Sequence, residues 1–239
     1  MILYKNPVML SILSGALLTL SWPVQGLSLL IFFSLIPLLF VEDQISKMNS
    51  KQKKLRLFAL SYLGFFIWNL GTTWWIVNSS VFGMAFAILC NTLFYTILIM
   101  LFHWSKKRLP LRTAYIFFVT LWIAFEKFHL EWDFSWPWLN LGNVFSEDVQ
   151  WIQWYEFTGS FGGSLWILII NIGLYEVFKN YPVSLKNTVW VKKMSPWLIC
   201  IAIPIAISLI IFEREKILVP NTEVLLLQPN IDPYNEKYS

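Results

Sequence analysis

A single acidic side chain stands in an apolar stretch that is rich in tryptophan and phenylalanine. Trp122 and Glu126 are four residues apart, so a helix places both side chains on one face. A charge inside a membrane span is costly, and an ionisable residue there suggests a functional site. Alternatively Glu126, which is close to the outer end of its span and is followed by Lys127, reaches the membrane interface. Both interpretations stay open.

An aromatic segment follows Glu126 and contains FSWPWLNLG, residues 134–142. Its tryptophans form a belt at the level of the lipid headgroups, or they line a path for acyl chains. Pro137 and Gly142 indicate a loop of defined shape. The segment is negatively charged, so a phosphate would need backbone amides, the side chain of Asn140 or Asn143, or a further domain. The tryptophans are Trp132, Trp136, Trp138, Trp151 and Trp154.

Neither cysteine has the surroundings of a nucleophile. Cys90 and Cys200 fall inside apolar runs, where a thiolate is disfavoured, so both are expected to pack. His103 and His129 lie at the ends of such runs without the neighbouring ligands that a metal site needs. We therefore assign no catalytic residue, no metal site and no cofactor to residues 1–239.

Membrane-spanning helices must position these residues. The chain is 57% hydrophobic and 13% charged, against roughly 25% charged residues in a soluble domain. Apolar runs of about 20 residues cross a membrane as helices, which satisfy their own backbone hydrogen bonds. We predict an all-α polytopic membrane protein with about seven transmembrane helices. The predicted spans are 8–22, 26–41, 57–77, 81–102, 113–130, 160–178 and 196–212.

Lys and Arg are enriched in cytoplasmic loops, and their distribution predicts the orientation. Fourteen of the 18 basic residues fall at the N-terminus or in the loops after the second, fourth and sixth spans. The loop between the fifth and sixth spans has five acidic residues and no Lys or Arg. The N-terminus is therefore predicted on the cytoplasmic side, and the chain after residue 212 on the other. The net charge of +4 forms no continuous basic face, so nucleic-acid binding is not expected.

The chain changes character after its last span. Residues 223–231, EVLLLQPNI, are typical of a short strand buried in an α/β sheet. A single strand is not stable alone. We therefore predict a transmembrane helical domain over residues 1–212, followed by a linker and the start of an α/β domain over residues 213–239.

Several motifs together resemble the apolipoprotein N-acyltransferases. The most distinctive is Trp122 and Glu126, followed by Trp136-Pro137-Trp138 and Gly142. Family members often carry an Arg shortly after this Glu, and Phe128 and His129 stand here instead, which puts a fixed ion pair in doubt. The other motifs occur in the family's order, and the resemblance covers essentially the whole chain. They are LSWP at 20–23, TTWWI at 72–76, GSFGGSLWILIIN at 159–171 and VLLLQPN at 224–230.

The resemblance implies transfer of an acyl chain from a membrane phospholipid to the N-terminal diacylglyceryl cysteine of a lipoprotein. The family uses a thioester on a cysteine, with a glutamate base and a lysine, in a nitrilase-like domain after the seventh span. Residues 213–239 would then be the linker and first strand of that domain, truncated before the catalytic residues. The chain alone is expected to be inactive.

We expect both substrates, phospholipid donor and diacylglyceryl lipoprotein acceptor, to be recognised at the aromatic segment. The implied location is the bacterial inner membrane, with several passes and a periplasmic C-terminal tail. The expected substrate-binding residues are Glu126, Trp136, Pro137, Trp138, Asn140 and Gly142.

A transporter or channel is the alternative function. Transporters usually show paired broken helices or several intramembrane charges, whereas only Glu126 and Glu176 are expected here. Asn69, Asn91 and Asn171 are polar residues within spans, for which interhelical hydrogen bonding is the commoner explanation. A purely structural subunit is the third possibility.

Overall fold

The computed structural model describes residues 6–23, 26–181, 188–216 and 225–228. These residues form α-helices joined by short 3-10 turns, and none of them lies in a β-strand. The α-helices are α1 Pro7–Ser21, α2 Ile31–Ser34, α3 Ile36–Ser46, α4 Lys53–Thr73, α5 Val81–Lys106, α6 Leu111–Glu131, α7 Tyr155–Asn180 and α8 Thr188–Lys216. The 3-10 turns are η2 Ser28–Leu30, η3 Trp74–Asn78, η4 Leu141–Phe145 and η5 Val149–Trp151.

Each predicted span overlaps helix in the described part of the chain, which confirms the all-α membrane fold. Within the described residues, four helical segments are long and apolar enough to cross a membrane: Ser28–Ser46, Val81–Lys106, Tyr155–Asn180 and Thr188–Arg214. α1 is a shorter apolar helix. α4 and α6 have 21 residues each, which corresponds to about 30 Å of helix, and both carry charged residues near their ends. A total of seven crossings stays a prediction.

The second span differs from the predicted continuous helix because it is interrupted at Leu35, between α2 and α3. Pro37 has no backbone N–H to donate to the carbonyl of Phe33. The side chain of Asn171 on α7 fills the interruption. Its Oδ1 accepts from the Leu35 N–H at 2.9 Å, and its Nδ2 donates to the carbonyl of Ile31 at 2.9 Å. An amide thus replaces the hydrogen bond that a regular helix would form there.

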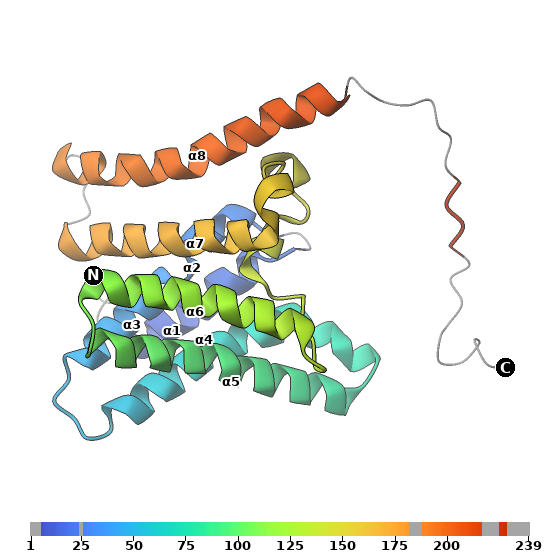
Figure 1. Ribbon diagram of the computed structural model, residues 1–239. Helices are drawn as coiled ribbons and strands as arrows, with labels where there is room; N and C mark the ends of the chain where they lie inside the picture. The colour runs from blue at the N-terminus through green and yellow to red at the C-terminus, as the bar shows by residue number, and fades with distance from the viewer. Residues whose placement is uncertain (1–5, 24–25, 182–187, 217–224, 229–239) are drawn as a thin grey trace.

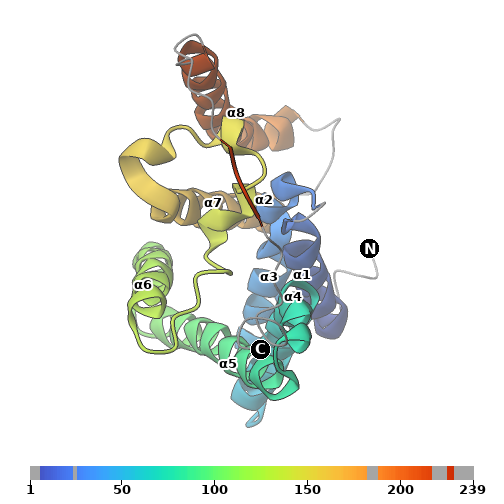
Figure 2. The ribbon, with the colours of Figure 1, turned by 90° about the vertical axis from the view of Figure 1, so that its right-hand side faces the viewer.

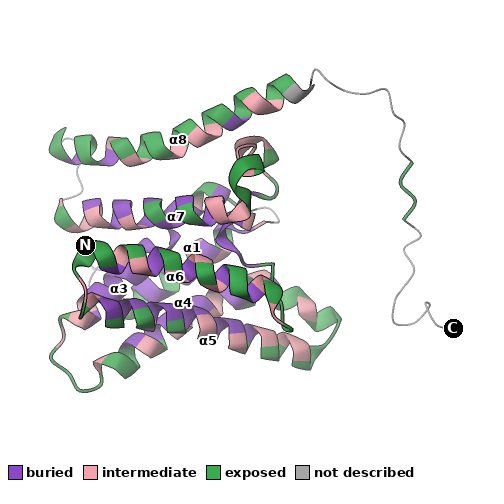
Figure 3. Cartoon of the chain, in the orientation of Figure 1, coloured by how far each residue is buried: buried purple, intermediate pink, exposed green. Residues whose placement is uncertain are grey.

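Aromatic side chains fill the contact between α4, α5 and α6. Trp68, Tyr95 and Trp122 are at most 1% exposed. The ring centroid of Tyr95 lies 4.9 Å from that of Trp68 and 5.3 Å from that of Trp122. Figure 3 shows that buried residues continue through α1, α3, α4 and α7. This core fixes the helices that carry the predicted site.

α8 lies at the edge of the bundle, beside α7 (Figure 1). Only 6% of its most apolar stretch is buried inside the protein, against 61% for α7, so the surface of α8 is suited to contact with lipid. The helix begins at Thr188, eight residues before Pro196, so Lys192 and Lys193 lie in the helix and not in the predicted loop. Pro196 and Pro204 both lie inside this helix, although proline disfavours a helix interior.

The two ends of the bundle differ in charge. The α3–α4 and α5–α6 connections, the end of α7 and the start of α8 lie together at the left of Figure 1. Together with the adjoining ends of α4, α5 and α6, these segments hold 12 of the 18 Lys and Arg residues, and we call this side the basic end. The α6–α7 connection lies at the opposite side, which we call the loop end. Which end faces the cytoplasm stays a prediction.

Two further acidic residues are buried near the basic end. Glu42 is 1% exposed, and it pairs with His103 Nδ1 at 2.7 Å and with Lys106. Asp43 pairs with Lys179 Nζ on α7 at 2.8 Å. α3 continues past residue 41, the predicted end of the second span, so both acidic residues lie just beyond that span in the same helix. Which charges lie within the membrane stays a prediction.

The predicted strand at 223–231 lies largely outside the described residues. Residues 225–228 are in no strand, and Leu225, Leu226 and Leu227 are exposed. α8 ends at Lys216, four residues beyond the predicted end of the transmembrane domain. The start of an α/β domain stays a prediction.

Candidate functional site

The connection between α6 and α7, residues 132–154, folds back onto the helices (Figure 1). We call it the aromatic loop. Its middle forms η4, whose apolar side chains are at most 1% exposed. Leu139 is fully buried, and its carbonyl accepts from the Tyr95 hydroxyl on α5 at 3.1 Å. The middle of the loop is therefore part of the protein core.

Glu126 is fully buried beneath the aromatic loop, so its carboxyl does not reach the protein surface. Its Oε1 accepts from Trp122 Nε1 at 3.1 Å, and the two side chains lie on one helical face as predicted. The same oxygen accepts from the Leu141 backbone N–H at 2.8 Å. The carboxyl therefore joins α6 to the first residue of η4 and fixes the path of the loop.

Gly142 allows η4 to approach α7 closely. Its N–H donates to Ser164 Oγ at 3.0 Å, and its carbonyl accepts from the Tyr155 hydroxyl at 3.0 Å. A Cβ atom at Gly142 would overlap the carbonyl of Ser160. Asn140, just before η4, is also buried. The predicted residues of this segment thus set the shape of the loop.

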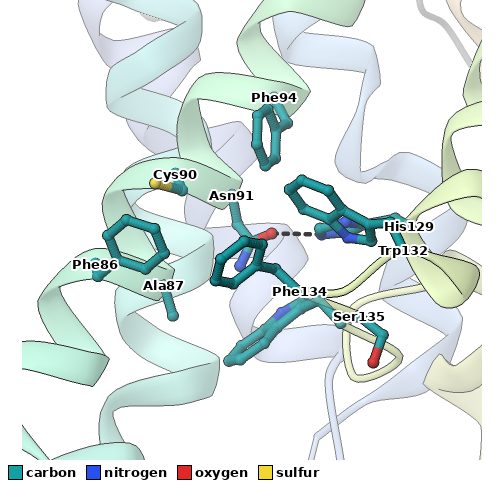
Figure 4. A pocket seen from close by; sticks show the side chains of 10 residues that line it. Phe86, Ala87, Cys90, Asn91, Phe94, His129, Trp132, Phe134 and Ser135 are labelled. Carbon is teal, nitrogen blue, oxygen red and sulfur yellow. Dashed lines mark hydrogen bonds between the residues drawn. The ribbon is translucent and has the colours of Figure 1, made fainter.

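The segment Trp136-Pro137-Trp138 contributes side chains to two separate cavities. Trp136 lines a cavity of about 450 Å³ between α5, α6 and the aromatic loop, which we call the α5–α6 cavity (Figure 4). Pro137 and Trp138 line a cavity of about 490 Å³ beside α1 and α4, the α1–α4 cavity. The remaining residues of the α5–α6 cavity are Phe86, Ala87, Cys90, Asn91, Phe94, His129, Trp132, Phe134 and Ser135.

The α5–α6 cavity is aromatic but contains one buried polar pair. His129 Nε2 lies 2.6 Å from Asn91 Oδ1, as Figure 4 shows. Because an amide oxygen only accepts, His129 carries its proton on Nε2 and presents Nδ1 as an acceptor. Among the described residues, neither this Nδ1 nor the indole N–H of Trp132 or Trp136 has a hydrogen-bond partner. A ligand with both apolar and polar groups would match this lining.

An apolar groove continues from the α5–α6 cavity along the two helices. It has a volume of about 550 Å³ and shares Phe94 and Trp132 with the cavity. Its other residues are Ile97, Leu98, Leu101, Leu121, Ala124, Phe125 and Phe128. Cavity and groove together form a path from the aromatic loop along the α5–α6 surface, with the chemistry that suits an acyl chain.

The α1–α4 cavity brings together three motifs that are far apart in the sequence. Trp22 and Pro23 follow α1, Thr72 and Thr73 end α4, and the aromatic loop contributes Trp138. The rings of Trp138 and Trp75 meet edge to face with centroids 5.6 Å apart. The lining also includes Leu139, Asn143 and Ser146.

Comparison with known proteins identifies the family. The apolipoprotein N-acyltransferase N-terminal domain matches residues 14–173, a region that contains the aromatic loop and both cavities. The chain belongs to this family.

Two curated relatives named apolipoprotein N-acyltransferase align with almost the whole chain. The relative from Chlorobaculum tepidum is 27% identical over 241 residues, which cover 98% of this chain and 43% of the relative. The relative from Geobacter metallireducens is 25% identical over 238 residues, which cover 95% of this chain and 44% of the relative. The chain therefore spans less than half the length of these relatives. No solved structure matches it.

The family resemblance seen in the sequence is confirmed, and both relatives are named as acyltransferases rather than as transporters or channels. Among the residues that carried the resemblance, Trp136, Pro137 and Trp138 line cavities. Glu126 and Gly142 line neither cavity and instead form hydrogen bonds that hold the aromatic loop. Contact of any of these residues with substrate stays a prediction.

The structure adds two lining residues to those expected from the apolipoprotein N-acyltransferase motifs. Asn91 and His129 were considered singly, one as a polar residue in a span and the other as a possible metal ligand. Their spatial pairing was not visible because 38 residues separate them. The sequence signal that could have pointed to them is that both are polar residues in or next to apolar runs.

Cys90 lines the α5–α6 cavity of this apolipoprotein N-acyltransferase family member, but its position is not that of an activated thiol. Figure 4 shows its sulfur directed away from His129, whose Nε2 is engaged by Asn91. Cys200 is exposed on α8. Neither described cysteine therefore forms a nucleophile–base pair. The packing role expected for both stays a prediction, since Cys90 is half-buried and Cys200 is exposed.

Proposed function

We propose that this chain is the membrane portion of an apolipoprotein N-acyltransferase that recognises the acyl donor and the acceptor. The reaction moves an acyl chain from a phospholipid to the N-terminal diacylglyceryl cysteine of a lipoprotein. The observation that carries the proposal is the folded aromatic loop, which lies within the family's matched region and borders two cavities. Its location is proposed as a bacterial inner membrane, with the basic end facing the cytoplasm.

The α5–α6 cavity and its groove are proposed to hold the acyl chain of the phospholipid. The groove supplies apolar surface, and the indole N–H groups of Trp132 and Trp136 are available to donate to ester carbonyl oxygens. Glu126, Asn140 and Gly142 serve by fixing the loop that carries Trp136.

The α1–α4 cavity is proposed to receive the diacylglyceryl acceptor. It opens on the other side of the same loop and is lined by Trp75 and Trp138 together with hydroxyl groups of α4. Thr72 and Thr73 bond to carbonyls of their own helix at 2.7 and 2.6 Å. Their remaining lone pairs are suited to a polar headgroup.

Photo-crosslinking tests the donor site directly. Residues 1–239 in nanodiscs are mixed with a phospholipid whose acyl chain carries a diazirine, and the labelled peptides are mapped by mass spectrometry. We expect labelling to concentrate on the facing surfaces of α5 and α6, and Trp136→Ala to reduce it. Trp104→Ala is the matched control, because Trp104 is a half-exposed tryptophan of α5 outside the cavity. Labelling spread evenly over the lipid-facing helices would contradict the proposal.

A further inference from the structure

A second groove lies at the basic end of the bundle, away from the aromatic loop. α6, α7 and α8 form it, with α7 between the other two (Figure 2). It has a volume of about 490 Å³. Trp197 of α8 lies against Gly173 of α7, where a Cβ atom would overlap the indole ring. The remaining lining residues are Leu111, Arg112, Tyr115, Ile116, Val119, Ile169, Ile172 and Glu176.

The charges in this groove are one cation and one anion that do not pair with each other. Arg112 is exposed and makes no ion pair or side-chain hydrogen bond with any residue that the structure describes. Glu176 Oε1 accepts from the Tyr115 hydroxyl, and its Oε2 accepts from Asn180 Nδ2 at 2.8 Å. These two donors hold the carboxylate in place and leave further lone pairs for a ligand.

The apolar part of the groove extends from the charged residues toward the middle of the bundle. Along α6 the lining runs from Leu111 to Val119, which corresponds to about 12 Å of helix. α8 borders the groove through Trp197 and is suited to lipid contact along most of its length. The shape therefore fits a headgroup at the basic end and the first part of an acyl chain beyond it.

We propose that this groove binds a zwitterionic phospholipid whose headgroup carries a phosphate and a primary ammonium, in the leaflet at the basic end. The guanidinium of Arg112 donates to the phosphate, a geometry for which Arg is well suited. The ammonium donates to Glu176. An anionic headgroup without an ammonium would leave the Glu176 carboxylate without a cationic partner, and a quaternary ammonium has no N–H to donate.

The site is separate from the aromatic loop and does not depend on the acyltransferase proposal. Its residues are not among those of either cavity at the loop end. The bound lipid would connect α6, α7 and α8, the last of which has few protein contacts of its own.

Lipid retention measured by native mass spectrometry tests the groove. Residues 1–239 are exchanged in detergent against equal amounts of dioleoyl phosphatidylethanolamine, phosphatidylglycerol and phosphatidylcholine. We expect phosphatidylethanolamine to be retained preferentially. Arg112→Gln should lower its retention roughly tenfold, the effect of losing a hydrogen bond to a charged group. Glu176→Gln should lower phosphatidylethanolamine retention and raise that of phosphatidylglycerol.

Arg108→Gln is the matched control, because Arg108 lies at the same end but stacks on Trp104, 4.4 Å from the ring centroid. It should leave retention unchanged. Ile116→Trp fills the groove without altering its charges and should also lower retention. It tests the site independently if either charge variant fails to fold. Preferential retention of phosphatidylglycerol by the unmodified protein, or equal losses from Arg108→Gln and Arg112→Gln, would show attraction by the basic end as a whole and would overturn the proposal.

Discussion

Glu126 fixes the position of the aromatic loop by a hydrogen bond to its backbone. Its Oε1 is the acceptor for two buried donors, the indole of Trp122 and the N–H of Leu141. A buried donor that loses its partner costs about 1–3 kcal/mol. The Trp122–Glu126 contact could be predicted from helical spacing. The bond to Leu141 could not, because it depends on how the aromatic loop packs against Tyr95 and α7.

The first prediction separates this anchoring role from a requirement for charge. Glu126→Ala removes the acceptor of both donors, so we expect the free energy of unfolding to fall by about 3 kcal/mol. Glu126→Gln keeps an oxygen at the same position and should stay within about 1 kcal/mol of the unmodified protein. Unfolding by SDS in mixed micelles, followed by tryptophan fluorescence, measures both variants. An equally large loss in Glu126→Gln would show that the carboxyl does more than accept hydrogen bonds.

At the scale of elements, the interrupted second span shows how one side chain completes the backbone hydrogen bonding of a neighbouring helix. Asn171 bridges the Ile31 carbonyl and the Leu35 N–H. Interhelical hydrogen bonding, predicted for the asparagines within spans, is confirmed for Asn91 and Asn171. It is wrong for Asn69, whose Nδ2 donates to Phe65 of its own helix. Composition predicts that such residues need partners, but the fold decides which partner is in reach.

The second prediction uses this difference between two fully buried asparagines. Asn171→Leu leaves the Leu35 N–H and the Ile31 carbonyl without the partner shown in the structure, so we expect a loss of about 2 kcal/mol in the free energy of unfolding. Asn69→Leu is the control and should cost less, because its amide bridges no helices. The two variants are compared by SDS unfolding. Equal losses would mean that the cost comes from side-chain volume and not from the bridge.

At the scale of the whole molecule, sequence patterns predicted the helices and the grouping of their connections. Apolar runs located the spans, because a backbone in lipid must form helices. The sequence missed the burial of Glu42, the break at Leu35 and the two cavities, since each depends on contacts between distant segments. The α1–α4 cavity in particular arises where Trp22, Thr72 and the aromatic loop meet, and no local pattern encodes that meeting.

The third prediction concerns orientation, which follows from the basic end. We expect Ser50, in the α3–α4 connection, to face the cytoplasm and Ser146, in the aromatic loop, to face the opposite side. Both residues are exposed, and they lie at opposite ends of the bundle. Single cysteines at these positions, with Cys90 and Cys200 replaced by Ser, are treated with a membrane-impermeant maleimide on intact spheroplasts. Labelling at position 50 but not at position 146 would show the opposite orientation and contradict the prediction.

The last prediction is that residues 1–239 alone recognise substrates but transfer no acyl group. Acyl transfer through a covalent intermediate needs a reachable nucleophile with a base beside it. Cys90 points away from His129, and Cys200 lies exposed on α8. Binding through the aromatic loop needs neither thiol, so phospholipid should still enter the α5–α6 cavity.

The assay gives the purified chain a labelled phospholipid and a diacylglyceryl peptide, and it follows acyl-enzyme and N-acylated peptide by mass spectrometry. We expect neither product above the protein-free control, while the alkylation of Cys90 by a lipid-soluble maleimide slows when phospholipid is added. Cys200 supplies the internal control, because it lies outside the cavity and its alkylation should be unaffected. An acyl group found on either cysteine would place reactive chemistry within these residues and overturn the prediction.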